Sequence, residues 1–172
     1  IFASSSSVYG DIKKETSLES DNTDNQISPY GATKKMAEIC CNLYNSLYDL
    51  DILAFRFFTV YGPRGRLNMA VMRFIQSIDR GNIVEVHGNG KIRRDFVYID
   101  DIIDAIEMSL KKKFDFDTLN IGSGKSHELN YLVNLIEKTL GKKAKKRYIP
   151  IQKGDVFSTR ASIEKAEKLL GW

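Results

Sequence analysis

The stretch SPYGATK at residues 28–34 contains the residue pair with the clearest chemical potential in the chain. Tyr30 and Lys34 are four residues apart, so on a helix their side chains share one face and can serve one ligand. A free phenol ionises near pH ~10, and a neighbouring ammonium stabilises the ionised form. Tyr30 could therefore act as a general acid and base, with Lys34 tuning it and donating hydrogen bonds to a sugar hydroxyl. An isolated Tyr-x-x-x-Lys pair is a weak indication by itself.

The chain around this pair has an ordinary globular composition. Its 172 residues are 42% hydrophobic and 28% charged, with a net charge of +4. No apolar run approaches the roughly 18 to 20 residues of a membrane helix, and no charged-then-apolar leader is present, so we expect a cytoplasmic protein without membrane association. Its lysine runs at 111–113 and 142–147 have no interleaved aromatic residues, which argues against nucleic-acid binding.

Cysteines and acidic residues predict neither a disulfide nor a metal site. Cys40 and Cys41 are adjacent in a predicted helix, where neighbouring side chains diverge, so we expect buried thiols in a reducing compartment. The acidic pairs at 100–101 and 115/117 are explained by helix N-terminal charge and loop solvation, since no cluster of His, Cys and carboxylate residues accompanies them.

The elements that must position the reactive pair alternate between strands and helices. The pattern predicts strands at 1–5, 51–58, 83–86, 94–98, 117–121 and 146–149, and helices at 28–47, 69–79, 100–110, 128–140 and 162–170. Ser28 is the expected N-cap of the first helix, with Pro29 in its first turn. Strands separated by helices of this length indicate an α/β fold with a parallel sheet and crossover helices.

The order of several motifs resembles the extended short-chain dehydrogenase/reductases, a family of NAD-dependent epimerases and dehydratases. The matching blocks are IFASSSSVYG, SPYGATK, RFFTVYGPRGR, GNGKIRRDFVYIDD, LNIGSGKSHEL and IPIQKGD, and they span essentially the whole chain. The resemblance implies the C-terminal part of a Rossmann-type parallel sheet with a smaller α/β nucleotide-sugar-binding domain. It assigns residues 1–62 and 92–122 to the Rossmann-type domain, and residues 63–91 and 123–172 to the substrate domain.

Family members begin with a half whose glycine-rich loop holds the NAD pyrophosphate, and an acidic residue follows it for the ribose. This chain has neither feature. Gly88-Asn89-Gly90 is too short and too late, and the GSGKS segment at 122–126 lacks the glycine that a phosphate loop needs at position 119, where Leu119 stands. We therefore expect a C-terminal fragment that begins inside a central strand and is inactive alone.

The resemblance assigns catalytic roles to three residues. Tyr30 would take the proton from the sugar 4-hydroxyl while hydride leaves C4 for the nicotinamide of NAD, Lys34 would hold the nicotinamide ribose, and Ser5 would hydrogen-bond the same sugar oxygen as Tyr30. Phe57 and Val60 are also expected to contact NAD, together with Tyr30 and Lys34.

Two further positions distinguish between reactions and substrates. The 4,6-dehydratases of the family have Asp-Glu where Ser6 and Ser7 stand, so dehydration is not expected. Residues 59–70 closely resemble UDP-glucuronate 4-epimerases, in which Thr59 matches a residue near the sugar and Arg66 matches one facing the C6 carboxylate. A guanidinium can hold a carboxylate with two parallel hydrogen bonds. Many of these epimerases have tryptophan where this chain has Arg64.

The resemblance therefore implies interconversion of UDP-glucuronate and UDP-galacturonate through a 4-keto intermediate. UDP-glucuronate decarboxylases also have arginine in this loop, whereas UDP-glucose 4-epimerases typically have asparagine at the Thr59 position. A UDP-glucuronate decarboxylase, a UDP-glucose 4-epimerase and an inactive UDP-sugar-binding remnant are the alternatives. For such sugars the resemblance also implies a role in surface polysaccharide biosynthesis.

Other residues match the UDP-binding positions of the family. Asn68 is expected to begin the second helix beside the diphosphate, and Arg94 matches the pyrophosphate arginine. The complete expected substrate-binding set is Ser5, Thr59, Arg66, Asn68, Val86, His87, Arg94, Gln152 and Asp155, in which positions 86 and 87 would line the uracil and positions 152 and 155 would reach the ribose. The family also implies a homodimer through the helix that contains Tyr30, whose apolar residues Met36, Ile39, Cys40, Leu43 and Leu47 could serve either the core or that interface.

Overall fold

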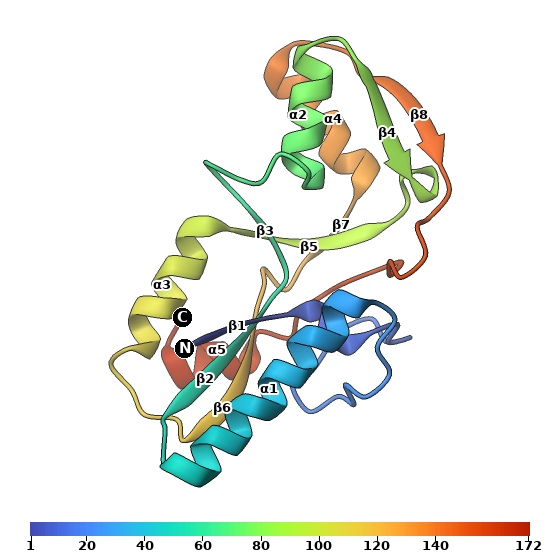
Figure 1. The fold of residues 1–172 in the computed structure, drawn as a ribbon. Helices are drawn as coiled ribbons and strands as arrows, with labels where there is room; N and C mark the ends of the chain where they lie inside the picture. Colours follow the sequence, from blue (N-terminus) through green and yellow to red (C-terminus); the bar gives the residue numbers. More distant parts are fainter.

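The computed structural model describes residues 1–172, which form two lobes (Figure 1). The strands are β1 (Phe2–Ser5), β2 (Ile52–Phe57), β3 (Thr59–Tyr61), β4 (Ile83–His87), β5 (Arg93–Tyr98), β6 (Phe116–Ile121), β7 (Ser126–Glu128) and β8 (Lys145–Ile149). The α-helices are α1 (Pro29–Tyr48), α2 (Ala70–Asp79), α3 (Ile99–Ser109), α4 (Leu129–Leu140) and α5 (Glu164–Leu170). Two short 3₁₀ helices are η1 (Ser6–Tyr9) and η2 (Gly88–Gly90).

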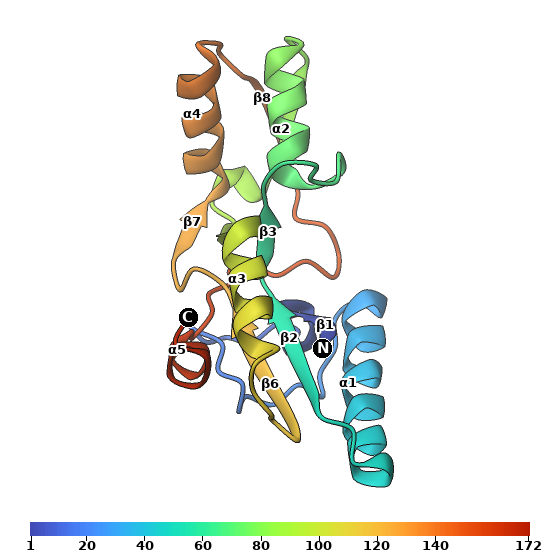
Figure 2. The same ribbon diagram turned by 90° about the vertical axis from the view of Figure 1, so that its left-hand side faces the viewer.

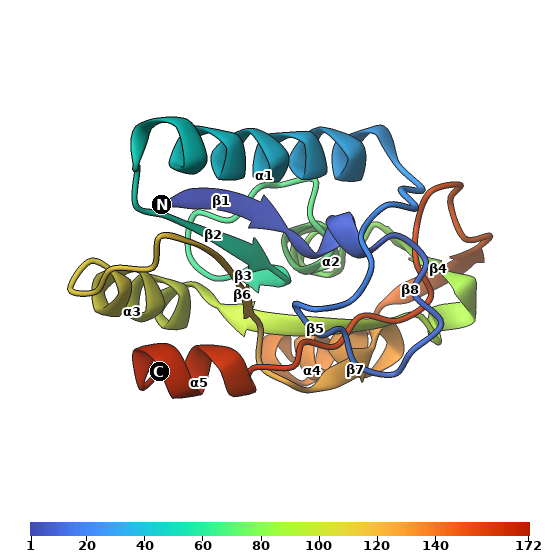
Figure 3. The same cartoon turned by 90° about the horizontal axis from the view of Figure 1, so that it is seen from below.

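The first lobe is built on a parallel sheet of order β1-β2-β6. Ser5 pairs with Phe57, and Phe57 pairs with Ile121, so all three strands end at one edge of the sheet. Helix α1 covers one face, and α3 and α5 cover the other (Figure 3). This layering confirms the expected α/β class with a parallel sheet. Ligands of open parallel sheets bind beyond the carboxyl ends of the strands, which directs attention to that edge.

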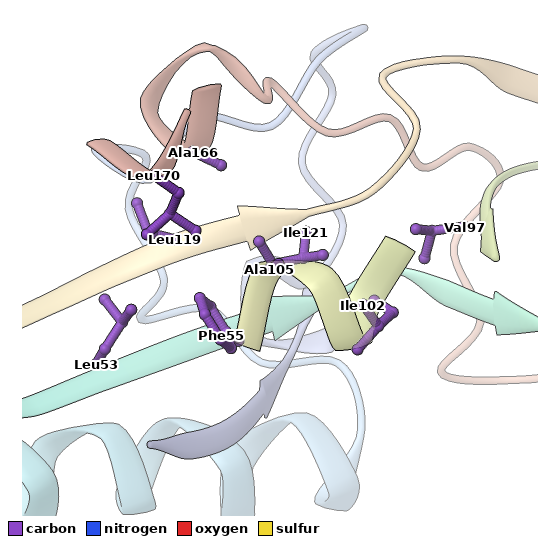
Figure 4. Packing of buried hydrophobic residues seen from close by; sticks show 9 residues of the cluster. All are labelled: Leu53, Phe55, Val97, Ile102, Ala105, Leu119, Ile121, Ala166 and Leu170. Atoms are coloured by element: carbon purple, nitrogen blue, oxygen red, sulfur yellow. The ribbon is translucent and has the colours of Figure 1, made fainter. Parts of the chain in front are cut away.

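Alternation along β2 assigns its side chains to the two faces. Leu53 and Phe55 point toward α3 and α5, where they join Leu119 and Ile121 of β6 in a cluster of nine buried residues (Figure 4). Burial of each such large apolar side chain stabilises the fold by about 1.5–3 kcal/mol. Arg56, which follows Phe55 in β2, faces α1 instead and is also buried.

In the second lobe, at the top of Figures 1 and 2, α2 and α4 pack on each other and on the parallel pair β4 and β8. Strand β5 pairs with β3 in parallel and with β7 antiparallel, and it connects the lobes. Helix α5, which we expected in the second domain, instead packs Ala166 and Leu170 into the core of the first lobe. The division of the chain into two domains stays a prediction.

Helix α1 begins as its sequence predicts, because the Ser28 side chain accepts a hydrogen bond from Gly31 N and Pro29 occupies the first helical position. The expectation of buried cysteines is wrong: Cys40 is exposed and Cys41 is only partly buried, because they lie off the stripe of α1 that faces the sheet. No helix in the structure has both the length and the apolar character to cross a bilayer.

Candidate active site

A cleft of about 650 Å³ opens at the carboxyl ends of β1 and β2. Nine of the residues predicted for a site line it: Ser5, Tyr30, Lys34, Phe57, Thr59, Val60, Arg66, Arg94 and Asp155. They come from β1, α1, the β2–β3 segment, the loop before α2, β5 and the C-terminal segment. The structure therefore brings together residues that are up to 150 positions apart (Ser5 to Asp155) in the sequence.

Ser5 lies where β1 ends and η1 begins. Its hydroxyl caps η1 by accepting from Ser7 N at 3.2 Å, and it donates to the Ser7 hydroxyl at 3.2 Å. The side chain is mostly buried but lines the cleft. Ser5 is thus a fixed hydroxyl at the floor of the cleft, with only another serine as its side-chain partner.

Tyr30 and Lys34 lie on the first turns of α1, next to that serine segment. A Cβ at Gly31 would lie 2.5 Å from Ser7 O, so glycine at this position allows the helix start to approach η1. Lys34 Nζ donates to Ala3 O at 2.8 Å and lies 5.7 Å from the centre of the Tyr30 ring. Tyr30 is 54% exposed, which leaves its hydroxyl available to a ligand.

A buried polar network holds α1 against the sheet behind these residues. Arg56 donates to both carboxylate oxygens of Glu38, at 2.9 Å each, and the pair is only 4% and 3% exposed. Ser4 Oγ donates to Glu38 Oε1 at 2.5 Å. Burial alone would lower the pKa of Arg56, but the hydrogen bonds and charge of Glu38 raise it. The guanidinium also donates to Tyr9 Oη at 3.1 Å, and burial raises the pKa of Tyr9 to about 12.

The loop between β3 and α2 supplies two cations that have no acidic partner. Arg64 and Arg66 both line the cleft, and neither forms a salt bridge. Arg64 adopts a left-handed backbone conformation with φ 60°. Both guanidinium groups are solvent-exposed, so an anionic ligand could recruit either without breaking an ion pair.

Arg94 and Asp155 lie next to each other in the wall of the cleft. Arg94 Nη2 donates to Asp155 Oδ1 in a close ion pair, and its Nη1 donates to Arg93 O at 2.7 Å. Burial lowers the pKa of Arg94, although the charge of Asp155 opposes that shift. A partly desolvated arginine of this kind interacts strongly with anions.

Four of the predicted substrate-binding residues lie away from the cleft. Val86 is fully buried in the core of the second lobe, and His87 Nδ1 is 2.9 Å from Pro150 O. Gln152 is exposed. Asn68 was expected to begin the second helix, but α2 begins at Ala70 with Met69 as its N-cap, so Asn68 lies in an exposed turn. Ligand-binding roles for these four residues stay predictions.

The cleft also contains residues that the motifs did not indicate. Lys14 comes from the loop between η1 and α1 and forms an ion pair with Asp21. Arg160, near the end of the chain, donates to Gly124 O at 2.8 Å and to Glu15 Oε1 at 2.7 Å. No periodic or motif signal marks either residue, because each reaches the cleft through contacts between segments far apart in the sequence.

Comparison with known proteins agrees with this geometry. Residues 1–122 match the model of the NAD dependent epimerase/dehydratase family. An uncharacterized protein of Methanocaldococcus jannaschii is 45% identical over 172 residues, and a UDP-glucuronate 4-epimerase of Thermodesulfobacterium geofontis is 42% identical over 173 residues. Each match covers 100% of this chain and 53% of the relative. The chain thus spans about half the length of the curated relatives it matches.

A solved structure also matches the fold of this chain. UDP-glucuronic acid 4-epimerase of Bacillus cereus, in complex with UDP-glucuronic acid and NAD, has a TM-score of 0.93 and 35% identity, over 99% of this chain and 54% of that one. The fold, the arrangement of the cleft and the extent of the family match lead to one conclusion: the chain belongs to the NAD dependent epimerase/dehydratase family.

Proposed function

We propose that the polypeptide containing this chain is an NAD-dependent UDP-sugar 4-epimerase that interconverts UDP-glucuronate and UDP-galacturonate. The observation that carries the proposal is the cleft in which Ser5, Tyr30 and the unpaired Arg66 converge. Relatives named UDP-glucuronate 4-epimerase, from Thermodesulfobacterium geofontis and Arabidopsis thaliana, are 42% and 41% identical to the chain and support it.

In this proposal the chain supplies acid–base chemistry and sugar recognition. Tyr30 takes the proton of the sugar 4-hydroxyl and later returns it, and Ser5 hydrogen-bonds the same oxygen. The fixed position of the Ser5 hydroxyl keeps that oxygen oriented while the proton moves. No carboxylate adjoins Ser5, since Ser6 and Ser7 follow it, which favours epimerisation over elimination of water.

The residues at this edge of the sheet fit the nicotinamide end of NAD. Lys34 uses one hydrogen bond on Ala3 O, which leaves two of its three donors for a ribose, and Phe57 and Val60 give the same cleft an apolar wall. Bound there, NAD would supply a hydride acceptor and donor. The family's pyrophosphate-binding loop has no counterpart in residues 1–172.

We assign sugar recognition to Arg66 and to Thr59, which line the same cleft. An unpaired guanidinium in the cleft can bind a C6 carboxylate with two hydrogen bonds, whereas a hydroxymethyl group offers no charge. Arg94 and Asp155 would serve the diphosphate and the uridine ribose. We also propose a cytoplasmic homodimer that pairs through α1.

The test uses the natural polypeptide that contains residues 1–172, supplied with NAD and UDP-glucuronate. We expect UDP-galacturonate, resolved by anion-exchange chromatography, and loss of turnover by about 10²–10⁴-fold in Tyr30→Phe. Tyr44→Phe, an equally exposed tyrosine on α1 outside the cleft, is the matched control and should keep full activity. Release of carbon dioxide without UDP-galacturonate would replace the proposal with a decarboxylase.

A further inference from the structure

Asp95 of β5 is a fully buried carboxylate that forms no salt bridge. Burying a charge is costly unless hydrogen bonds compensate it. Oδ1 accepts from Ser123 N at 2.6 Å and from the Ser123 hydroxyl at 2.8 Å, while Oδ2 accepts from Gly124 N at 3.1 Å and from Ala161 N at 2.9 Å. Four neutral donors from two other segments therefore surround a single carboxylate.

This arrangement explains why the GSGKS segment is not a phosphate site. Successive backbone N–H groups, here those of Ser123 and Gly124, form concave anion-binding sites in phosphate loops. In this chain the carboxylate of Asp95 already fills that position. A Cβ at Gly122 would lie 2.9 Å from Asp95 Oδ2 and 2.7 Å from the Ala161 Cβ, so the turn and the carboxylate are packed too closely for any ligand.

The second segment held by Asp95 is residues 155–161, which we call the strap. The strap pairs with β5: Arg93 N donates to Phe157 O at 2.9 Å, and Thr159 N donates to Arg93 O at 3.2 Å. Asp95 N donates to the Thr159 hydroxyl at 3.1 Å, and its side chain holds Ala161. Asp95 thus fixes the strap through both its backbone and its carboxylate.

The other side of the strap is a wall of the cleft. Five strap residues line it: Asp155, Val156, Ser158, Thr159 and Arg160. Side chains alternate along β5, so Arg94 reaches the cleft while Asp95 points away from it. The same strand therefore presents a cation to the cleft and, one residue later, anchors the segment that places Asp155 against that cation.

We propose that Asp95 is a positioning residue that holds the strap in the geometry needed to bind a nucleoside diphosphate in the cleft. The inference rests on the proposed function, because it takes the cleft to be the UDP site. A carboxylate is required since asparagine would keep only one acceptor oxygen and would place an NH₂ group against N–H donors. Ser123→Ala removes one of the four donors and should have a graded, smaller effect.

The experiment measures UDP affinity by calorimetry and amide hydrogen exchange by mass spectrometry on the natural polypeptide and its Asp95→Asn variant. We expect UDP to bind at least about tenfold more weakly, since buried donors lose their acceptor. Exchange should accelerate in the strap and at 122–124, while the core strand β2 stays protected. Ser123→Ala should weaken UDP binding by less than about threefold, and Asp101→Asn, on the exposed start of α3, should change neither measurement.

Each outcome decides a separate point. The inference is overturned if Asp95→Asn leaves the UDP affinity unchanged, because Asp95 would then be dispensable for binding. It is also overturned if hydrogen exchange accelerates in β2 as much as in the strap, because Asp95 would then stabilise the whole fold. A wild-type protein that binds no UDP overturns the proposed function itself. The positioning role is supported if UDP binds more weakly and hydrogen exchange accelerates only in the strap and in the turn at residues 122–124.

Discussion

At the scale of single residues, the charges in the cleft divide into paired and unpaired groups. Arg94 has Asp155 as its partner, whereas Arg66 has none. An unpaired arginine is free to select a substrate by its charge. Arg66 is therefore the residue that the proposed preference for a uronate depends on most directly.

Replacing Arg66 with methionine keeps much of the side-chain length and removes the charge. We expect the ratio of kcat/KM for UDP-glucuronate to that for UDP-glucose to fall by about 10–100-fold, because a charged hydrogen bond contributes about 1.5–3 kcal/mol. Arg66→Lys keeps the charge without the bidentate geometry, so its ratio should lie between those of the wild type and Arg66→Met. An unchanged ratio in Arg66→Met would show that another residue recognises the sugar.

The buried phenol of Tyr9 predicts how the free energy of unfolding changes at alkaline pH. Burial raises its pKa to about 12 from 10.0, so the folded protein keeps the phenol proton at a pH where the unfolded chain has lost it. The unfolded state then binds fewer protons, and the free energy of unfolding falls as pH rises from 10 to 12. The stabilisation is fully present below pH 10 and amounts to about 2–3 kcal/mol by the usual 1.36 kcal/mol per pKa unit.

The measurement compares urea unfolding of wild type and Tyr9→Phe at pH 9 and at pH 11.5. Phenylalanine loses the hydrogen bonds to Asn120 and Arg56, so it should be less stable at pH 9. Between pH 9 and pH 11.5, the free energy of unfolding of Tyr9→Phe should then fall less steeply than that of the wild type. Parallel slopes would contradict the assignment of the alkaline loss to Tyr9.

At the scale of elements, α1 and β1 are aligned by one stripe of the helix. Tyr30, Lys34 and Glu38 follow one another at intervals of four, so they share a face. Lys34 binds Ala3 O and Glu38 binds Ser4 Oγ, on consecutive residues of β1. The stripe that contains the proposed acid–base residue is therefore the one that fixes the helix on the strand leading to Ser5.

Glu38→Gln should test the strength of this alignment. It leaves the buried Arg56 without its anionic partner, and breaking a buried ion pair costs about 3–5 kcal/mol of unfolding free energy. The double variant Glu38→Leu, Arg56→Met removes both charges and should recover most of that loss in urea denaturation. A loss below about 1 kcal/mol in Glu38→Gln would mean that packing alone aligns the helix.

The long elements could be predicted from the sequence because their signals are local. Ser28 and Pro29 mark the start of α1, and apolar periodicity marks α4, whose expected and observed ends agree within one residue. The three-residue strands β3 and β7 were not predicted, since their backbone partners lie in β5 and not in their own sequence. Asn68 was misplaced because asparagine is a favoured N-cap residue, whereas α2 begins at Ala70 with Met69 as an N-cap that forms no side-chain hydrogen bond.

At the scale of the whole molecule, the cleft depends on contacts that no local pattern indicates. Ser17 pairs with Ala161, and its N–H donates to Arg160 O at 2.8 Å, which joins the loop before α1 to the strap near the C-terminus. Motif resemblance identified Ser5, Tyr30 and Arg66 as site candidates, but Lys14 and Arg160 could be found only in three dimensions. At the Gly122 turn the sequence and the structure agree: the GSGKS segment lacks the glycine that a phosphate loop needs at position 119, and the geometry of the turn leaves no room for a ligand.

One large apolar surface remains open on the molecule. Met36, Ile39, Leu43 and Leu47 recur every three or four residues along α1, and each is more than half exposed. The proposed homodimer would bury this stripe against its symmetry-related copy. Placing a charge at its centre should then separate the subunits, because an unpaired buried carboxylate is strongly unfavourable.

Leu43→Asp should shift the protein from dimer to monomer in analytical ultracentrifugation at micromolar concentration, with a dissociation constant raised by at least about 100-fold. Leu135→Asp, at a similarly exposed leucine of α4, is the matched control and should leave the dimer intact because it lies in the other lobe. A monomeric wild type whose thermal midpoint falls in Leu43→Asp would contradict the dimer. If that fall also exceeds the fall in Leu135→Asp, which has the same cost in helix propensity, another part of the same polypeptide would cover the stripe, because a contact within one polypeptide lowers stability at every protein concentration.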